Sequence, residues 1–501
     1  MIQEIIVNLC TLEVAVAMIV AILGGMLIGA LPGLSATMGV ALLIPLTYSM
    51  TPSAALIMLT VLYTSAIYGG SFTAILIHTP GTASSAATAM DGYQLTLKGQ
   101  GLRALGIATV SSMFGGTVSA VMLMFIAPQL AKLSLMFGPP EYFLISLFGL
   151  TVIGSLASGN MLKGLMAGVL GLIISTCGTH IYTGYYRFTF NITLLQDGIR
   201  SVVAMIGLFS LSQVLIQVED YVHATKKRFE NSDLLLKGRR LPSWDEIKFL
   251  FPNMIRSSII GVLVGILPGA GGDIGSWVSY NEAKRFSKNK EEFGKGSIEG
   301  ICASEAANNA VTGGALIPLL TLGVPGSSTT AVVLGALLIH GLTPGHTLFA
   351  TNGTIVYTMM AAFLIGNILM GFVGLLISKR IVRMCNIPTC ILSPVIVVLA
   401  TIGAYSIAMN IFDVCVMLFF GFLGYLMKKT KIPAAPLVLG MLLGETAELG
   451  YTQSITIAKG RPLFEVFIGR PICIILMIMI ILAIVSPFIA DYYTKRRAWK
   501  K

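Results

Sequence analysis

Small hydroxyl side chains follow Pro-Gly pairs at three places in the chain, and each pair interrupts a long apolar stretch. They are Ser35 and Thr37 after Pro32-Gly33, Ser84 and Ser85 after Pro80-Gly81, and Ser327, Ser328 and Thr329 after Pro325-Gly326. Proline interrupts a helix, and glycine lets another group approach closely. A helix that restarts after such an interruption directs its N-terminal N–H groups, which carry partial positive charge, toward it. With the hydroxyls, these helix ends predict a site for an anion such as a carboxylate, with Gly33, Gly81 and Gly326 allowing close approach.

A second group of polar residues has the chemistry of a cation site. Asp273 follows the fourth Pro-Gly pair, Pro268-Gly269, where a carboxylate would repel an anion and suit a cation. Glu305, Asn308 and Asn309 have spacings of three and four residues, so they share one face of a helix. Polar groups in an apolar membrane segment tend to face a cavity or pathway. We expect these four residues to bind a coupling cation, Na⁺ or H⁺; for Glu305 a helix cap at the membrane surface is an equal alternative.

The interruptions belong to a duplicated unit. The phrase from Gly25 to Gly33 returns from Gly261 to Gly269, 236 residues later. The phrase that begins at Pro80 returns at Pro325, 245 residues later. One Pro-Gly pair would favour an ordinary kink packed with small residues, but four pairs in duplicated positions favour a binding site, because matched broken helices mark substrate sites in transporters.

The elements that must position these residues are membrane helices. Hydrophobic residues make up 55% of the chain, charged residues 11%, and the mean hydropathy is +0.85. Apolar runs of a length that spans a bilayer, about 20 residues, are clearest at Leu12–Leu31, Ala104–Ala127, Tyr142–Ser158, Leu162–Ile181, Ser201–Val218, Thr354–Ser378, Ile391–Met409, Ile411–Met427 and Ile472–Ala490. The composition predicts an all-α polytopic membrane protein with roughly 10–13 membrane segments, re-entrant hairpins included.

The charge pattern suggests how the two copies are arranged. The net charge of +11 comes mainly from short loops and the C-terminal end, which is typical of the positive-inside rule rather than of nucleic-acid binding. We predict a first membrane repeat over residues 1–218, a charged cytoplasmic linker over 219–250, and a second repeat with C-terminal helices over 251–501. The first copy starts from a segment without Lys or Arg and the second from the basic linker, which predicts an inverted-topology repeat.

The positions of the basic residues and of the cysteines are also informative. Lys and Arg are absent before Lys98 and between Gly296 and Ser378, so helix ends, hydroxyls and a bound cation would have to neutralise an anionic substrate. The seven cysteines are scattered without a CxxC pair or a partnering His cluster, so we expect neither a metal site nor a cofactor.

Taken together, these phrases resemble the large membrane subunit of the tripartite tricarboxylate transporters, the TctA family. The resemblance is carried by Gly29-Ala-Leu-Pro-Gly33, Tyr68-Gly-Gly-Ser71, His78-Thr-Pro-Gly81, Met90-Asp-Gly-Tyr93, Arg187-Phe-Thr-Phe190, Gly265-Ile-Leu-Pro-Gly269, Glu299-Gly300, Glu305-Ala-Ala-Asn-Asn-Ala310, Gly323-Val-Pro-Gly326 and Leu338-Ile-His-Gly341. It covers most of the chain and is weakest after about Asn386. Ser304 departs from the pattern, because the resemblance leads us to expect proline there.

The resemblance implies a permease of the bacterial inner membrane that imports carboxylates such as citrate-like tricarboxylates, coupled to Na⁺ or H⁺. It further implies two partners: a small membrane subunit (TctB-like) and an extracytoplasmic solute-binding protein (TctC-like). Two other classes remain open from the residues alone. One is a channel for ions or solutes, and the other is an intramembrane aspartyl protease that uses Asp273 and Asp413.

Overall fold

The chain folds almost entirely into α-helices. The computed structural model describes residues 2–31, 34–156, 161–180, 183–223, 241–267, 271–384 and 389–498. Within these ranges, eight helical segments are long and apolar enough to cross a membrane. They are Leu12–Ala30, Pro52–Ile77, Gly101–Leu133, Ser201–Glu219, Trp244–Ile266, Gly353–Ser378, Ile391–Ala408 and Ile411–Lys429. The protein is therefore an all-α polytopic membrane protein, as predicted.

The order of the elements follows the apolar runs of the sequence. The first half contains α1 (Ile2–Leu9), α2 (Leu12–Ala30), α3 (Ala36–Thr47), α4 (Pro52–Ile77), η1 (Ala83–Ser85), α5 (Ala86–Leu97), α6 (Gly101–Leu133), η2 (Ser134–Met136), α7 (Pro139–Leu156), α8 (Met161–Ser175), β1 (Gly178–Thr179), β2 (Tyr186–Arg187), η3 (Thr193–Leu195), α9 (Ser201–Met205), the π-helical turn η4 (Ile206–Leu211) and α10 (Ser212–His223). The predicted run Leu162–Ile181 is too long, because the helix ends at Ser175 and a short hairpin follows.

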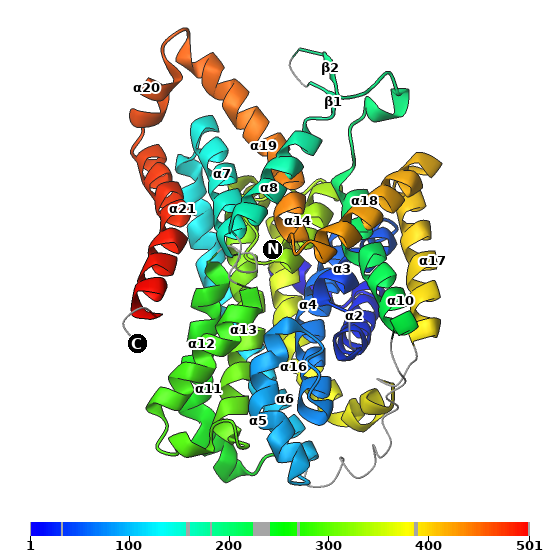
Figure 1. The fold of residues 1–501 in the computed structure, drawn as a ribbon, viewed down its shortest axis with the longest axis vertical. Helices are drawn as coiled ribbons and strands as arrows, with labels where there is room; N and C mark the ends of the chain where they lie inside the picture. Colours follow the sequence, from blue (N-terminus) through cyan, green and yellow to red (C-terminus); the bar gives the residue numbers. More distant parts are fainter. Residues whose placement is uncertain are drawn as a thin grey trace.

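The second half is also built of long helices separated by shorter ones. It contains α11 (Trp244–Ile266), α12 (Gly271–Phe286), η5 (Lys290–Glu292), α13 (Ile298–Leu322), α14 (Ser328–Ile339), α15 (His346–Thr351), α16 (Gly353–Met384), α17 (Thr389–Ala408), α18 (Ile411–Lys429), α19 (Ala434–Ala458), α20 (Leu463–Ile468) and α21 (Pro471–Ala498). The β1–β2 hairpin and α20 lie at one end of the molecule, and α5 and α11 reach the other (Figure 1).

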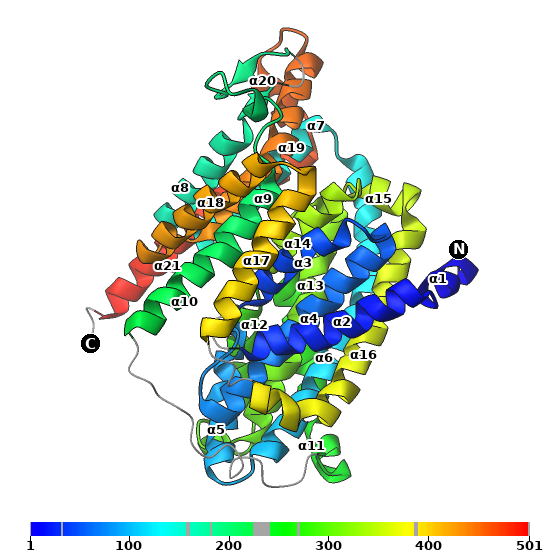
Figure 2. The ribbon, with the colours of Figure 1, turned by 90° about the vertical axis from the view of Figure 1, so that its right-hand side faces the viewer.

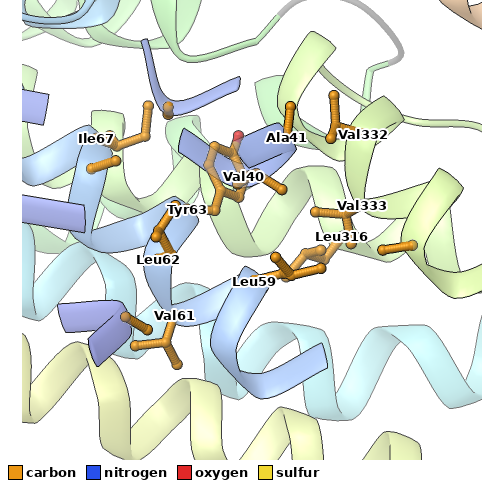
Figure 3. Packing of buried hydrophobic residues seen from close by; sticks show 14 of the residues in the cluster. Val40, Ala41, Leu59, Val61, Leu62, Tyr63, Ile67, Leu316, Val332 and Val333 are labelled. Atoms are coloured by element: carbon orange, nitrogen blue, oxygen red, sulfur yellow. The ribbon is translucent and has the colours of Figure 1, made fainter. Parts of the chain in front are cut away.

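Helices α4 and α13 occupy the centre. Almost every residue of both is buried, because α2, α6, α11 and α16 pack around them (Figure 2). Gly, Ala, Ser and Thr are frequent on both central helices, and small residues let membrane helices approach closely. The apolar contacts continue to the short helices, since Val40 of α3 and Val333 of α14 lie in the same cluster as Leu59 of α4 and Leu316 of α13 (Figure 3).

The same backbone contacts occur in both copies of the duplicated unit. A Cβ added at Gly29 of α2 would lie 2.0 Å from the carbonyl oxygen of Ala66 in α4. At Gly265 of α11 it would lie 2.6 Å from the carbonyl oxygen of Val311 in α13. Gly265 is 236 residues beyond Gly29, and Val311 is 245 residues beyond Ala66, the two offsets found in the sequence. The duplication therefore preserves a packing arrangement as well as the phrases.

The second interruption of each copy is also built alike. A Cβ at Gly81 would meet the carbonyl oxygen of Gly29 at 2.0 Å, and one at Gly326 would meet that of Gly265 at 2.5 Å. Helix α4 ends in a left-handed residue, His78, with φ 55°, and α13 ends in Gly323, with φ 70°. Each Pro-Gly pair therefore folds back against the first interrupted helix of its own copy.

An acidic side chain connects the two copies. Asp91 on α5 is buried, and its Oδ1 accepts backbone N–H bonds from Gly294 and Gly296 at 2.8 Å and from Ser297 at 2.9 Å. Its Oδ2 accepts from the hydroxyl of Tyr280 on α12 at 2.8 Å. The Met90-Asp-Gly-Tyr93 phrase thus has a structural role, because its carboxylate holds the loop before α13 against α5.

The predicted domain boundaries stay a prediction. Helix α10 ends at His223 and α11 begins at Trp244, so the end of the predicted linker 219–250 is helical. Ser243 caps α11 through a capping box with Glu246, which explains where that helix begins. Residues 224–240 lie outside the described part of the chain.

Candidate functional site

A cavity of about 410 Å³ lies where the helix interruptions meet. Its wall includes residues of both copies: Ser35, Thr37, Gly81, Thr82, Ser84, Gly271, Ser327, Ser328 and Thr329. Helices α3 and α14, which begin at this cavity, lie side by side (Figure 2). The volume lies within the ordinary range of small-molecule sites, about 300–1,000 Å³.

The start of α14 presents polar groups to the cavity. Ser327 is its N-cap: the Oγ accepts the N–H of Thr330 at 3.2 Å, and the Thr330 Oγ1 accepts the N–H of Ser327 at 2.8 Å. These two bonds satisfy two donors of the first turn. By helix geometry, the N–H groups of Ser328 and Thr329 point out of the helix start. The partial positive charge of this end therefore faces the cavity.

The start of α3 meets the start of α14. Thr37 Oγ1 lies 2.9 Å from Thr329 Oγ1 and 3.1 Å from Ser328 Oγ, which joins the first copy to the second. Ser35 caps α3 by accepting the N–H of Met38 at 3.1 Å. Tyr63 of α4 completes this part of the wall, with its hydroxyl 3.2 Å from Ser327 Oγ. Four predicted residues, Ser35, Thr37, Ser328 and Thr329, are thus brought together.

The first copy contributes a tighter turn. Thr82 and Ser84 both line the cavity, with their hydroxyl oxygens 3.2 Å apart. The chain then enters the 3₁₀ turn η1 before α5 begins, so this end is less regular than the start of α14. The carbonyl of Ser84 accepts from the hydroxyl of Ser276 on α12 at 2.8 Å. Helix α12 is therefore packed directly against this turn.

Two of the predicted anion-site residues lie off the cavity wall, and a third is outside the described part of the chain. Ser85 is fully buried, donates to the carbonyls of Gly70 and Thr82, and does not line the cavity. Gly326 is also off the wall, and its role is close packing against Gly265. Gly33 lies outside the described residues. Spacing alone could not separate Ser84 from Ser85, because adjacent residues of a tight turn point in different directions.

Two polar residues of the wall were missed by sequence reasoning. Gln213 of α10 and Lys428 of α18 line the cavity, and the Lys428 Nζ donates to the Gln213 Oε1. The sequence placed Lys428 among loop charges, because it ends an apolar run. The sequence led us to expect helix ends, hydroxyls and a bound cation as the sources of positive charge, and the cavity wall includes the basic side chain of Lys428 as well.

Glu305 lies in a second polar region, away from the cavity wall. It is fully buried in α13, and three hydroxyls from the first copy donate to its carboxylate. Ser71 of α4 and Thr88 of α5 donate to Oε1, with Ser71 at 2.6 Å, and Ser112 of α6 donates to Oε2 at 2.7 Å. The alternative of a surface cap is wrong, since this carboxylate is completely enclosed. Because both oxygens already accept hydrogen bonds, Glu305 anchors four helices to one another.

The two predicted amides lie in the same buried layer but are less satisfied. Asn309 donates to Thr64 Oγ1 at 3.1 Å, while its Oδ1 has no hydrogen-bond partner among the described residues. Neither polar atom of Asn308 has a partner there, although the side chain is completely buried. Thr64 in turn donates to Asn367 on α16 at 2.8 Å. An unpaired buried amide costs about 1–3 kcal/mol, so these atoms have unused capacity for a cation or a water molecule.

One helix connects the two regions. Tyr63 and Ile67 of α4 line the cavity, whereas Thr64 and Ser71 of the same helix bond within the buried layer.

The side chain of Asp273 lies outside what the structure describes, although its backbone belongs to the first turn of α12.

Ser304, the departure noted in the sequence, does not weaken its helix. Helix α13 begins at Ile298 and runs without interruption through Ser304. The Ser304 Oγ lies 2.8 Å from that of Thr88, so the residue adds a polar contact to the layer around Glu305.

Comparisons with known proteins agree with these features. A sequence model of the tripartite tricarboxylate transporter TctA family matches residues 15–439. An uncharacterized 52.8 kDa protein from the TAR-I ttuC' 3' region of Agrobacterium vitis is 39% identical over 95% of this chain and 93% of its own length. An uncharacterized protein from the TAR-II ttuC' 3' region of the same organism is 36% identical over 47% of this chain and 97% of its own length. No solved structure matches.

Proposed function

Because the chain belongs to the TctA family of tripartite tricarboxylate transporters, we propose that it is the permease of a secondary active importer of carboxylates, driven by Na⁺ or H⁺. The protein would work in the bacterial inner membrane with a TctB-like small membrane subunit and a TctC-like solute-binding protein. The observation that carries the proposal is the cavity, whose wall is formed by helix starts and hydroxyls from both copies.

The substrate carboxylate would bind at the start of α14. There the N–H groups of Ser328 and Thr329 and the hydroxyls of Thr37 and Ser328 meet at one wall of the cavity. Oriented N–H groups at a helix start stabilise an anion without a neighbouring cation. Ser35 and Ser84 extend the polar wall on either side, and Gly81 keeps it open to close approach.

The coupling cation would bind in the buried layer. Asn308 and Asn309 supply amide oxygens with unused hydrogen-bonding capacity, and hard cations such as Na⁺ prefer oxygen ligands. Glu305 would supply a negative charge nearby, held in place by its three hydroxyl donors. Asp273 lies in the first turn of α12, whose first residue, Gly271, lines the cavity, and would be the second carboxylate of this group.

Transport would move one substructure against the other around the cavity. We infer that the copies have opposite orientations in the membrane, with residues 1–218 and 251–501 as the repeats and 219–250 as their linker. The matching packing at Gly29 and Gly265 supports equivalent halves, and the loop charges support their inversion. The contact between Thr37 and the start of α14 would be remade as one substructure moves against the other.

Uptake in inverted and right-side-out membrane vesicles tests the proposal. The chain, its small subunit and its solute-binding protein are expressed together, and uptake of labelled citrate is followed while Na⁺ and H⁺ gradients are varied separately. We expect saturable uptake that collapses when one of the gradients is dissipated. Uptake that is non-saturable and independent of both gradients would identify a channel and contradict the proposal.

A further inference from the structure

An arginine lies near the middle of a helix that is long and apolar enough to cross a membrane. Helix α11 runs from Trp244 to Ile266, and Arg256 is half-buried on it. The Arg256 Nη2 donates to the Asn253 Oδ1 at 2.9 Å, while its Nε is buried without a hydrogen-bond partner in the described part of the chain. Charged residues within membrane segments are costly and commonly mark a binding site or a pathway. Arg256 does not line the cavity and is not among the donors to Glu305, so the transport sites do not account for it.

A second arginine contacts the same aromatic ring as Arg256. The ring of Phe286, which ends α12, is exposed, and the guanidinium carbon of Arg256 lies 4.8 Å from its centroid. The guanidinium carbon of Arg285 lies 5.8 Å from the same centroid. Guanidinium groups interact favourably with aromatic faces, so Phe286 keeps both positive charges at this place. Arg285 also lies 3.5 Å from Glu282 in an exposed ion pair, and such pairs are weak in water.

The hydrogen-bond partner of Arg256 is an amide, which carries no charge. The Asn253 Oδ1 accepts from Arg256, and the Asn253 Nδ2 donates to the backbone carbonyl of Glu299 at 2.9 Å, so both ends of the amide are occupied. The Glu299 carboxylate accepts from the Ser287 hydroxyl at 2.5 Å. Among the residues that the structure describes, Arg256 forms no ion pair. Its charge therefore has no acidic partner there, although it lies on a helix that can cross the membrane.

The exposed side chains next to the two arginines are apolar on both helices. On α11 they are spaced by four residues, which places them in one row along the helix: Ile255, Ile259 and Leu263. On α12, which packs against α11 (Figure 1), three of them precede Arg285: Ile274, Trp277 and Val278. Lys284 and Lys288 are exposed at the end of α12 and just beyond it, so the surface changes there from apolar to basic. Such a boundary suits a phospholipid, because acyl chains contact apolar side chains and cations attract anionic headgroups.

We propose that Arg256 and Arg285 bind the phosphate group of an anionic membrane phospholipid, whose acyl chains lie along the exposed apolar side chains of α11 and α12. The guanidinium fork matches a pair of phosphate oxygens, and charge-assisted hydrogen bonds of this kind are stronger than neutral ones. A headgroup without a positive charge of its own is favoured beside two arginines. Asn253 is a positioning residue, because it connects Arg256 to α13 through the Glu299 carbonyl. The site needs no substrate in the cavity, so this inference does not depend on the proposed function.

Trp277 provides a local readout of the lipid. It is exposed on α12 eight residues before Arg285, which is about 12 Å along a helix and close to the depth of mid-chain carbons below a headgroup. Bromine atoms at mid-chain quench the fluorescence of a tryptophan that they contact. The chain contains three tryptophans, so Trp244→Phe and Trp499→Phe leave Trp277 as the reporter.

The test reconstitutes the full chain into vesicles of mixed phosphatidylglycerol and phosphatidylcholine, with bromine on one lipid or on the other. We expect brominated phosphatidylglycerol to quench Trp277 with an apparent preference of about tenfold or more, which is typical of hydrogen bonds to charged groups. Arg256→Gln combined with Arg285→Gln should reduce this preference to less than about twofold. Arg285→Gln alone changes an exposed side chain, so it should fold normally and lose part of the preference.

An arginine on another membrane helix provides the matched control. Arg380 is exposed near the end of α16, and Arg380→Gln removes the same charge as Arg285→Gln. We expect it to leave the lipid preference unchanged. Arg256→Lys keeps the charge without the planar fork, so it should retain only part of the preference.

Each remaining outcome would overturn the inference. Equal quenching by the two brominated lipids, with both arginines present, would show that the site does not select an anionic lipid. An unchanged preference in Arg285→Gln and in the double variant would remove the arginines from the site. An equal loss with Arg380→Gln would show a general effect of charge. If millimolar inorganic phosphate abolishes the preference, the site takes the free ion, and the lipid assignment is wrong.

Discussion

The cavity and the buried layer around Glu305 are made from the same kinds of residue, yet their hydrogen bonds are used differently. In the cavity, the hydroxyls of Thr37 and Ser328 bond to other hydroxyls among the described residues, and the start of α14 faces the cavity. In the buried layer, Ser71 and Ser112 each donate to one carboxylate oxygen of Glu305. The donors of the cavity wall are therefore available to a ligand, whereas the donors of the buried layer bond to Glu305 and hold helices together.

The amides Asn308 and Asn309 are intermediate between these two regions in how far their hydrogen bonds are satisfied. They are as buried as Glu305, but several of their polar atoms have no partner among the described residues. Polar residues inside a membrane protein are thus of three kinds here: satisfied by the protein, open to a cavity, or buried and incompletely satisfied. This difference leads to separate expectations for stability, substrate uptake and ion dependence.

The largest effect is expected at Glu305. Leucine at this position would leave the hydroxyls of Ser71, Thr88 and Ser112 without their acceptor, and each loss costs about 1–3 kcal/mol. We expect Glu305→Leu to destabilise the protein by about 3 kcal/mol or more, measured by thermal unfolding in detergent. Glu305→Gln keeps an acceptor oxygen, so its melting temperature should lie between those of Glu305→Leu and the wild type. A normal melting curve for Glu305→Leu would show that the layer does not anchor the helices.

Two serines that the sequence treats alike should behave differently. Ser328→Leu places a bulky apolar side chain at the cavity, so we expect uptake of labelled citrate to be abolished while the melting temperature stays near that of the wild type. Ser85→Leu instead overfills a packed turn, where Ser85 bonds to the carbonyl of Gly70, and overpacking costs about 1–3 kcal/mol. Equal effects of the two changes on stability would remove the distinction between wall and packing.

Ion dependence should respond to Asn309. Asn309→Leu removes an amide oxygen that has no partner among the described residues, and a bond to Thr64. We expect the ion concentration for half-maximal uptake to rise about tenfold, the loss of one ligand to a charge, before the substrate KM changes. Transport assays at varied Na⁺ and pH check this. Unaltered ion dependence would contradict the cation assignment.

The smallest effect is expected at Thr37. Thr37→Val removes hydroxyl contacts to Thr329 and Ser328 while keeping the side-chain volume, so we expect a loss of about 0.5–1.5 kcal/mol in stability and a several-fold rise in substrate KM. Thr60→Val is the control, because within the described part of the chain the Thr60 hydroxyl donates to carbonyls of its own helix. A larger effect from Thr60 than from Thr37 would argue against the contact between the copies.

Much of the fold could be predicted because membrane helices leave a strong local signal. Long apolar runs such as Ile411–Met427 correspond closely to helices, here α18, since each backbone group in lipid must be satisfied within its own helix. The candidate site was predicted in part. The duplicated phrases led to Ser35, Thr37, Ser84, Ser328 and Thr329, because helix-capping chemistry is local.

The remaining parts of the site could not be predicted, because they depend on distant contacts. Lys428 is 99 residues beyond Thr329 in the chain, and only the packing of α18 against α10 brings it to the cavity wall. The sequence around Glu305 does not show whether its carboxylate faces a cavity or already accepts hydrogen bonds from the protein. Its donors come from three helices of the other copy, each with an ordinary Ser or Thr.

The sequence by itself determined that this is a duplicated helical membrane protein of the TctA family whose helices break at Pro-Gly pairs, since hydropathy and helix capping act over a few residues. The tertiary structure alone decided which polar groups face the cavity and which are already hydrogen-bonded inside the protein. That choice depends on hydrogen bonds between helices far apart in the chain. Local composition carries no information about those partners.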